Sequence, residues 1–219
     1  MSDRSSYDVY VYIQNGMADW EIGHVTSELC SKRFFRDDAP EVRFSTVGDT
    51  KETRRSMGGM NVVPDIAVPD IETGENAVLV LPGSSAWPEL RKARIMDAAE
   101  DIVSEGGTVC AICGSTVALA DRGILDRRLP TCNGPGFLEH FSPSYLGGPM
   151  YKDVPAVSDG GVITAGSPGG LLWSKLILER LSVFSPETLD AWYSYFSTCD
   201  PRYYYAIEAS LCHEDRYLE

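Results

Sequence analysis

The sequence has no long hydrophobic run, and none of its purely apolar stretches is longer than residues 77–81. A helix that spans a bilayer needs about 20 apolar residues, so we expect no membrane-crossing segment. The N-terminal residues MSDRSSYDVYVYIQ also lack the apolar centre of a signal peptide. From this absence we expect a cytoplasmic location.

Basic residues are in the minority: 19 Lys and Arg stand against 32 Asp and Glu, which gives a net charge of −13 and a pI of about 4.6. Such a chain repels phosphate backbones and anionic lipid surfaces. The composition therefore argues against nucleic acid and membrane partners.

Cysteines number six, and histidines only three. Without a secretory signal, reduced thiols are the expected state of the cysteines. Cys110 and Cys113 form a CxxC pair, but no second ligand pair has a suitable spacing for zinc. We therefore expect no metal site.

Repeats and low-complexity segments are also absent, and 219 residues suit one well-cored domain. Hydrophobic residues make up 43% and charged residues 23% of the chain, as in ordinary globular proteins. We therefore expect a single domain over residues 1–219.

Strand-like and helix-like segments alternate along the chain, which predicts parallel βαβ units in an open, doubly wound α/β sheet with helices on both faces. The expected strands are residues 7–13, 42–47, 77–83 and 162–165, together with the strand that opens TVCAICGSTVALADRG; the expected helices are residues 19–33, 87–104 and a segment ending near residue 181. A hairpin is expected at residues 54–63, and an additional C-terminal helical segment at about 186–212.

Ligands of such sheets bind at the carboxyl ends of the strands. The topology predicts that three loops meet there, namely residues 15–20, 82–87 and 113–116. The candidate site is therefore expected among these loops.

Cys113 lies where a predicted strand passes sharply into a helix, with the small residues Gly114 and Ser115 directly after it. This arrangement is typical of a nucleophile elbow. The positive end of the helix dipole should lower the pKa of the thiol, and the amides of Gly114 and Ser84 are candidates for an oxyanion hole. Cys110 lies inside the strand, where a buried structural role is expected.

Several segments together resemble the ThiJ/PfpI family, which includes the Parkinson's-linked protein, intracellular proteases and glyoxalase-type enzymes and is related to class I glutamine amidotransferases. The segments are AICGSTVALADRGILD, NGMADWEIGHVTSEL, LVLPGSSAW and GGVITAGSPGGLLWSKLILERL, and the tail SPETLDAWYSYF resembles a putative-protease branch of the family. The resemblance implies a flavodoxin-like sandwich, often homodimeric, that needs no cofactor. It also identifies the segment containing Gly83 as the family's oxyanion loop.

Glu21 matches the family's acidic residue whose carboxyl contacts the reactive thiol. A buried carboxyl beside a thiolate should hold a proton, because two adjacent negative charges are costly. Glu21 is therefore expected to act as the acid and base of the site. The alternative is an ordinary acidic residue in a first helical turn, and Asp19 is expected to cap that helix.

The sequence departs from the family's hydrolases because no histidine stands where they place one. Protease-like members carry His directly after the nucleophile, where this chain has Gly114, and residues 129–133 contain no His either. His24 follows Glu21 by three residues and so lies near the same helix face, which makes it a possible pocket residue. The alternative is a histidine on the flank of the helix.

Further residues are candidates for lining the pocket, although each also has an ordinary structural explanation. They are Trp87, Ser115, Cys132, Asn133 and Ser167. The segment GSPGG at residues 166–170 can cradle an anion at a helix start, but its spacing is not that of a dinucleotide-binding fingerprint.

Three functions remain open at this point. The first is an enzyme that acts on a small carbonyl or amide-type substrate, with Cys113 as nucleophile and Glu21 as acid and base. The second is a redox-responsive stress protein in which Cys113 is reversibly oxidised. The third is a non-catalytic interaction module on the same fold.

Overall fold

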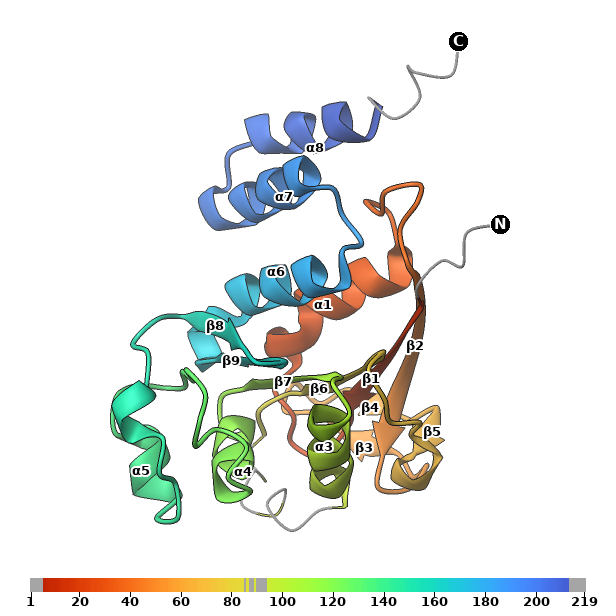
Figure 1. Cartoon of the computed structure of the whole chain (residues 1–219). Helices are drawn as coiled ribbons and strands as arrows, with labels where there is room; N and C mark the ends of the chain where they lie inside the picture. Colours follow the sequence, from red (N-terminus) through yellow and green to blue (C-terminus); the bar gives the residue numbers. More distant parts are fainter. Residues whose placement is uncertain (1–5, 85, 87–88, 90–93, 213–219) are drawn as a thin grey trace.

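A seven-stranded sheet forms the centre of the computed structural model, which describes residues 6–84, 86, 89 and 94–212 (Figure 1). The strand order is β5-β2-β1-β6-β7-β9-β8. The strands are β1 (Ser6–Tyr12), β2 (Glu41–Gly48), β5 (Ile66–Ala67), β6 (Ala77–Leu81), β7 (Thr108–Ile112), β8 (Ala156–Asp159) and β9 (Val162–Ala165). All neighbouring pairs are parallel except β8 and β9, which confirms the predicted flavodoxin-like α/β class.

Helices cover both faces of this sheet, with α1 and α6 on one side and α3 and α4 on the other (Figure 1). The helices are α1 (Asp19–Ser31), α3 (Ile95–Ser104), α4 (Ser115–Asp121), α5 (Phe137–Phe141), α6 (Gly170–Leu181), α7 (Pro186–Thr198) and α8 (Arg202–Cys212), and short 3-10 turns span Val68–Asp70, Gly148–Met150 and Ser167–Gly169. No helix in the described part of the chain combines the length and the apolar character needed to cross a bilayer.

The central strands are apolar at every position because both of their faces are buried. Val78 and Val80 of β6 pack against the α1 and α6 side, whereas Leu79 and Leu81 pack against the α3 and α4 side. All five residues of β6 and all five of β7 are buried. The two-residue period of a strand thus divides one apolar run between two cores.

Two edge features extend the predicted sheet. The expected hairpin at residues 54–63 is present as β3 (Arg54–Arg55) paired with β4 (Asn61–Val62). The antiparallel strand β8 was not predicted. It joins β9 through Gly160 and Gly161, both with positive φ, as a tight hairpin turn requires.

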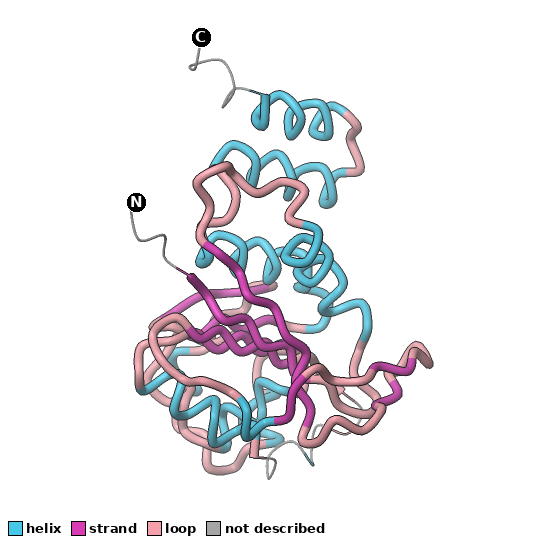
Figure 2. The backbone as a smooth tube through the Cα atoms, turned by 90° about the vertical axis from the view of Figure 1, so that its right-hand side faces the viewer, coloured by secondary structure: helices cyan, strands magenta, loops and turns pink. Residues whose placement is uncertain are grey.

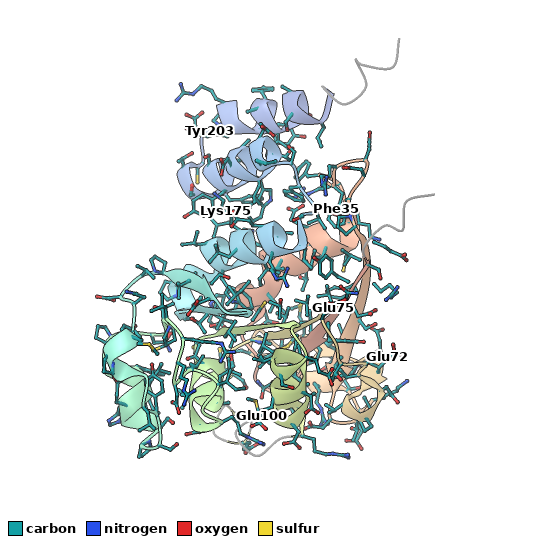
Figure 3. The ribbon with its side chains drawn as sticks, viewed as in Figure 1. Phe35, Glu72, Glu75, Glu100, Lys175 and Tyr203 are labelled. Atoms are coloured by element: carbon teal, nitrogen blue, oxygen red, sulfur yellow. The ribbon has the colours of Figure 1, made fainter. Side chains whose placement is uncertain are left out.

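The C-terminal helices α7 and α8 lie outside the helix layer that covers the sheet, as Figures 1 and 2 show from two directions. The start of α7 follows the prediction, because Ser185 caps it by accepting the amide of Thr188 and Pro186 is its first residue. Lys175 of α6 extends toward α7 (Figure 3), where its Nζ lies 2.7 Å from Asp190 Oδ1.

Candidate active site

Cys113 occupies the turn between β7 and α4 with a φ of +59°, which is a left-handed conformation that residues other than glycine rarely adopt. Its amide donates to the carbonyl of Ala165 at 2.9 Å, so strand β9 holds the turn in place. A strained non-glycine residue at the end of a central strand is the geometry of a nucleophile elbow. The structure therefore places the sulfur at the carboxyl edge of the sheet.

Ser115 stabilises this turn and does not line the pocket, which corrects the prediction for this residue. The side chain is fully buried. Its Oγ donates to the carbonyl of Leu81 at 2.7 Å and accepts the amide of Ile112 at 3.1 Å. These bonds tie α4 to the ends of β6 and β7, because a serine hydroxyl can both donate and accept.

Glu21 is almost completely buried, with 1% of its surface exposed, and its carboxyl group is held by two donors. The hydroxyl of Ser167 donates to Oε1 at 2.7 Å, and the amide of Gly83 donates to Oε2 at 2.7 Å. The amide of Gly83 already donates its hydrogen bond to Glu21. Gly83 therefore positions the acid and is not an oxyanion donor, contrary to the expectation.

Asn133 completes a ring of contacts around the thiol. Its Nδ2 lies 3.3 Å from Cys113 Sγ, and its Oδ1 accepts the amide of Ser167 at 2.9 Å. Ser167 in turn donates to Glu21, and a Cβ built on Gly83 would lie within 3.2 Å of both Glu21 Oε2 and Cys113 Sγ, so the acid is adjacent to the sulfur. Four side chains that are far apart in the sequence thus meet at one point, and the structure places all four where the sequence reasoning expected a site.

The loop after β6 contains further residues that the sequence predicted for the site, including the candidate oxyanion donor Ser84. The hydroxyl of Ser84 donates to the carbonyl of Asn15 at 2.8 Å and accepts the amide of Ala86 at 3.0 Å, which anchors the loop. The amide of Ser84 has no acceptor within the described residues, and the amide of Gly114 acts to lower the pKa of the Cys113 thiol. Trp87, the other candidate in this loop, lies outside the described residues.

Burial raises the pKa of both reactive groups. For Glu21, hydrogen bonds from Ser167 and Gly83 and the contact with Cys113 oppose this rise. For Cys113, burial raises the pKa of the thiol against the hydrogen bond from Asn133, and the charge of Glu21 adds to the rise. The lowered thiol pKa expected from the helix dipole is therefore not what the structure shows. Both groups therefore keep their protons to a higher pH than they would in water, because a charge on either is poorly solvated.

Two grooves flank the ring of contacts. One, of about 340 Å³, is bordered by Cys132, Asn133 and Asp153. Cys132 itself is 5% exposed and its thiol faces Gly134 O at 3.6 Å, so it borders this groove with little exposed surface. The other, of about 470 Å³, is bordered by Trp20, His24 and Ser167. The two grooves share Pro168, and each is bordered by one residue of the ring, Asn133 in the first and Ser167 in the second.

His24 points into the second groove from helix α1 and packs edge-on against two aromatic rings of α7. Its ring centroid lies 4.8 Å from that of Phe196 and 5.9 Å from that of Trp192. Burial lowers the pKa of the imidazole, with Glu28 opposing this. His24 is therefore a neutral groove residue at neutral pH, and nothing in the structure gives it a hydrogen bond to the thiol.

Asp19 does not cap α1, which corrects another prediction. The N-cap position is occupied by Ala18, and Asp19 is the first helical residue. Its Oδ2 accepts the amide of Gly58 at 2.5 Å, so Asp19 attaches the β3–β4 hairpin to the start of α1. The order Asp19-Trp20-Glu21 in the sequence indicates the start of a helix, but it does not show at which residue the helix begins.

Cys110 is fully buried, as predicted for a structural residue, and burial raises the pKa of its thiol strongly. In the described part of the chain no three His, Cys, Asp or Glu residues come together in a way that could hold a metal ion.

Replacing Gly83 with alanine should damage the site, because an added Cβ would lie 2.7 Å from Cys113 Cβ and 2.7 Å from Glu21 Oε2. We expect a loss of about 1–3 kcal/mol in the free energy of unfolding, together with slower reaction of Cys113 with iodoacetamide. Urea denaturation and mass spectrometry measure the two effects. The same change at Gly23, where nothing lies within 4 Å, is the control and should not destabilise the protein. Equal behaviour of the two variants would contradict the described packing.

The fold and the site define an α/β protein with a cysteine elbow, a buried carboxylic acid at the sulfur, and a binding edge at the carboxyl ends of parallel strands. Residues 7–180 match the family model described as the DJ-1/PfpI family, and the chain belongs to this family. The resemblance found in the sequence is thereby confirmed.

Individual relatives agree with this assignment. The uncharacterized protease YoaZ of Bacillus subtilis (strain 168) is 36% identical over 199 residues, which cover 91% of this chain and 95% of YoaZ. The crystal structure of the thiJ/pfpI family protein from Bacillus anthracis has a TM-score of 0.91 at 33% identity and covers 96% of this chain and 99% of its own. The glutathione-independent glyoxalase DJR-1.2 of Caenorhabditis elegans is 27% identical over 126 residues, which cover 56% of this chain and 63% of that protein.

Proposed function

We propose that the protein is a cysteine-dependent enzyme that acts on a small carbonyl compound, with Cys113 as nucleophile and Glu21 as the group that moves the proton. The observation that supports this most directly is the contact ring of Glu21, Ser167, Asn133 and Cys113 at a strained elbow. A ring of this kind holds the sulfur and the acid in one fixed geometry, which is what nucleophilic catalysis requires.

The first chemical step is addition of the thiol to the carbonyl carbon. The S–C bond forms while the π bond of the carbonyl breaks, and its electron pair moves to oxygen. Glu21 accepts the proton of the thiol and returns it to that oxygen, so the product is a hemithioacetal with no net loss of protons. The amides of Ser84 and Gly114 are the candidate hydrogen-bond donors to the developing oxyanion.

The size of the substrate is inferred from the two grooves bordered by Asn133 and by Ser167, at about 340 and 470 Å³. They suit a small molecule or a short extended segment rather than a folded protein surface. Two relatives, a protease and a glyoxalase by name, belong to enzyme classes that act on carbonyl groups. Because no histidine accompanies the thiol, we favour a reactive aldehyde or ketone over a peptide amide, which has a poor leaving group.

A second candidate function is reversible oxidation of Cys113 by a peroxide. Asn133 Nδ2 lies 3.3 Å from the sulfur, and the Gly114 amide and the Ser167 hydroxyl both act to lower the pKa of the thiol. Donors in this arrangement stabilise the oxygens of a sulfenic or sulfinic acid. The homodimer and the cytoplasmic location expected from the sequence stay predictions.

Changing Glu21 to glutamine should reduce kcat/KM for a carbonyl substrate by about 10²–10⁴-fold, because an amide cannot move the proton. Methylglyoxal is a suitable first substrate, followed by larger aldehydes. Alkylation of Cys113 by iodoacetamide should continue in this variant, since the nucleophile is still present. The matched control is Asp153→Asn, which removes a carboxylate from the adjoining groove without touching the ring of contacts.

The pH profile of kcat/KM gives a second readout of the same variant. Below the raised pKa of Glu21 the pair carries two protons and has no base, so the acid limb should lie above the ordinary value of 4.5. Above the raised pKa of Cys113 the pair carries none, so the alkaline limb should lie above 9.0. A bell-shaped profile is therefore expected, and Glu21→Gln should lose the acid limb. An unchanged profile in that variant would remove Glu21 from the mechanism.

A further inference from the structure

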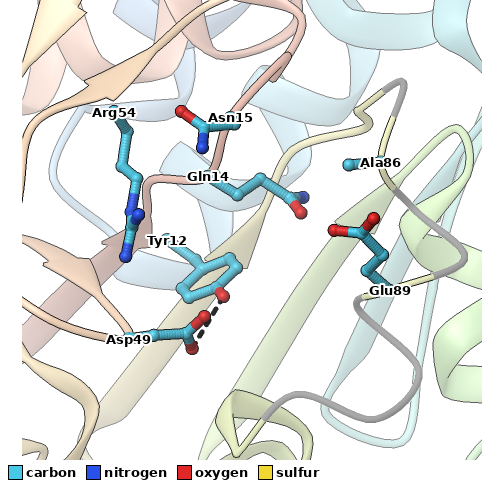
Figure 4. A pocket seen from close by; sticks show the side chains of 7 residues that line it. All are labelled: Tyr12, Gln14, Asn15, Asp49, Arg54, Ala86 and Glu89. Atoms are coloured by element: carbon cyan, nitrogen blue, oxygen red, sulfur yellow. Dashed lines mark hydrogen bonds between the residues drawn. The ribbon is translucent and has the colours of Figure 1, made fainter.

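A pocket other than the two grooves described above lies at the carboxyl edge of the sheet, between the ends of β1 and β6. The chain runs from β1 outward to β2 and then returns across β1 to β6, so the strand order reverses at this pair. Open α/β sheets bind ligands in the crevice at such a switch point. The pocket is bordered by Tyr12 at the end of β1, Gln14 after β1, Asp49 after β2 and Glu89 after β6, and has a volume of about 160 Å³ (Figure 4).

This pocket is distinct from the Cys113 site. Tyr12 belongs to the core on the α3 and α4 side of the sheet, whereas Cys113 packs against the core on the α1 and α6 side. The loop that contains Ser84 separates the two, since its hydroxyl is bonded to the carbonyl of Asn15. A ligand here would not contact the reactive sulfur.

The lining carries opposite charges on opposite sides. Figure 4 shows the guanidinium of Arg54 on one side of the pocket and the carboxylate of Glu89 on the other, with Tyr12 and Gln14 between them. Asp49 lies beside Tyr12, whose hydroxyl donates to Asp49 Oδ1 at 2.9 Å. That bond leaves the second oxygen of Asp49 available.

Arg54 has more donors than the protein uses. Its side chain is only 19% exposed, yet within the described residues its one hydrogen bond goes to Thr50 Oγ1 at 3.2 Å. The carboxylate of Glu52 stands farther off, at 3.9 Å, and is 79% exposed. A largely covered guanidinium with free N–H groups favours an anionic partner, above all a carboxylate.

Gln14 and Glu89 provide the complementary groups. Gln14 is 9% exposed and is fixed by its Nε2, which donates to the carbonyl of Pro82 at 3.4 Å. Its Oε1 is an acceptor with no donor among the described residues, and the carboxylate of Glu89 is likewise unpaired there. Acceptors of this kind favour an ammonium group.

We propose that this pocket binds a small zwitterion of the amino-acid class, with its carboxylate on Arg54 and its ammonium group between Glu89 and Gln14. A volume of about 160 Å³ equals the space of about five water molecules at roughly 30 Å³ each, which suits a ligand of this size. Each charge of the ligand faces a lining group of opposite charge. Such complementarity is a basis of specificity in polar sites.

The test is a titration of the full-length protein, followed by isothermal calorimetry, with glycine, β-alanine and 4-aminobutyrate. These zwitterions differ only in the separation of their charges. Butyrate, butylamine and glucose are the matched probes with one charge or none. We expect at least one zwitterion to bind at least tenfold more tightly than all three of these probes.

Variants then locate the site. Arg54→Gln and Glu89→Gln should each raise the Kd at least tenfold, whereas Arg55→Gln, the neighbouring exposed arginine on the same strand, should change it less than twofold. Circular dichroism and urea denaturation show whether each variant is folded.

Cys113→Ser should leave the affinity unchanged, which separates this proposal from the proposed enzyme activity. Binding of no zwitterion, equal binding of butyrate, butylamine or glucose, or full affinity in folded Arg54→Gln would each overturn the proposal.

Discussion

Changing Cys113 to serine should lower kcat/KM for the carbonyl substrate by about 10³-fold or more, while leaving the fold intact. The reason is local: the sulfur lies at a strained elbow, and among the described residues no other thiol shares its contacts with Asn133 and the neighbouring Glu21 and Ser167. A serine hydroxyl fits the same space but is a much weaker nucleophile than a thiol, because it gives up its proton far less readily. Steady-state kinetics and circular dichroism measure the two halves of this prediction.

Cys199→Ser is the matched control, because this cysteine is exposed and also adopts a positive φ, of +58°, at the end of α7. It should keep full activity. Full activity in folded Cys113→Ser would end the enzymatic proposal. Absence of turnover in the unmodified protein, together with selective oxidation of Cys113 under mild peroxide, would instead favour the redox function.

Changing Glu28 to alanine should destabilise the protein by about 2–4 kcal/mol, the second large effect that the structure predicts. Glu28 is fully buried on α1. It accepts the indole N–H of Trp192 at 3.0 Å and the Nε–H of Arg33 at 2.9 Å. Removing the carboxylate leaves the buried indole donor of Trp192 without a partner and loses the hydrogen bond between α1 and α7.

Urea denaturation measures this loss. Asp38→Ala removes a carboxylate that also pairs with an arginine, Arg36, but its side chain is 74% exposed. Solvent-exposed ion pairs contribute little, so the control should change the free energy of unfolding by less than about 0.5 kcal/mol. Similar losses in the two variants would show that the Glu28 contacts do not hold α7 in place.

Helices α1 and α7 show which features could be predicted from the sequence and which could not. The start of α7 was predictable because Ser185 and Pro186 act on the amides of their own helix. The bond from Trp192 to Glu28 was not, because it joins residues 164 positions apart. Aromatic residues in the C-terminal segment indicate packing, but not which surface they pack against.

In the active site, too, some features were predictable from the sequence and others were not. Ser115 and Ser167 are both small polar residues just after a strand, and both were candidates for the pocket. Ser115 turned inward to bond the ends of β6 and β7, whereas Ser167 turned toward Glu21. The direction of each hydroxyl depends on which strands are neighbours, and strand order is a property of the assembled sheet.

The amino-acid sequence by itself determined the α/β alternation, the elbow at Cys113 and the candidate acid at Glu21, because short-range patterns and family motifs carry them. The tertiary structure alone decided that Gly83 positions the acid, that Asp19 holds a hairpin, and that burial raises the pKa of the thiol. It also decided which charges face one another at the end of β1. Hydrogen bonds and desolvation depend on distances between segments that are remote along the chain, and these distances exist only once the sheet has formed.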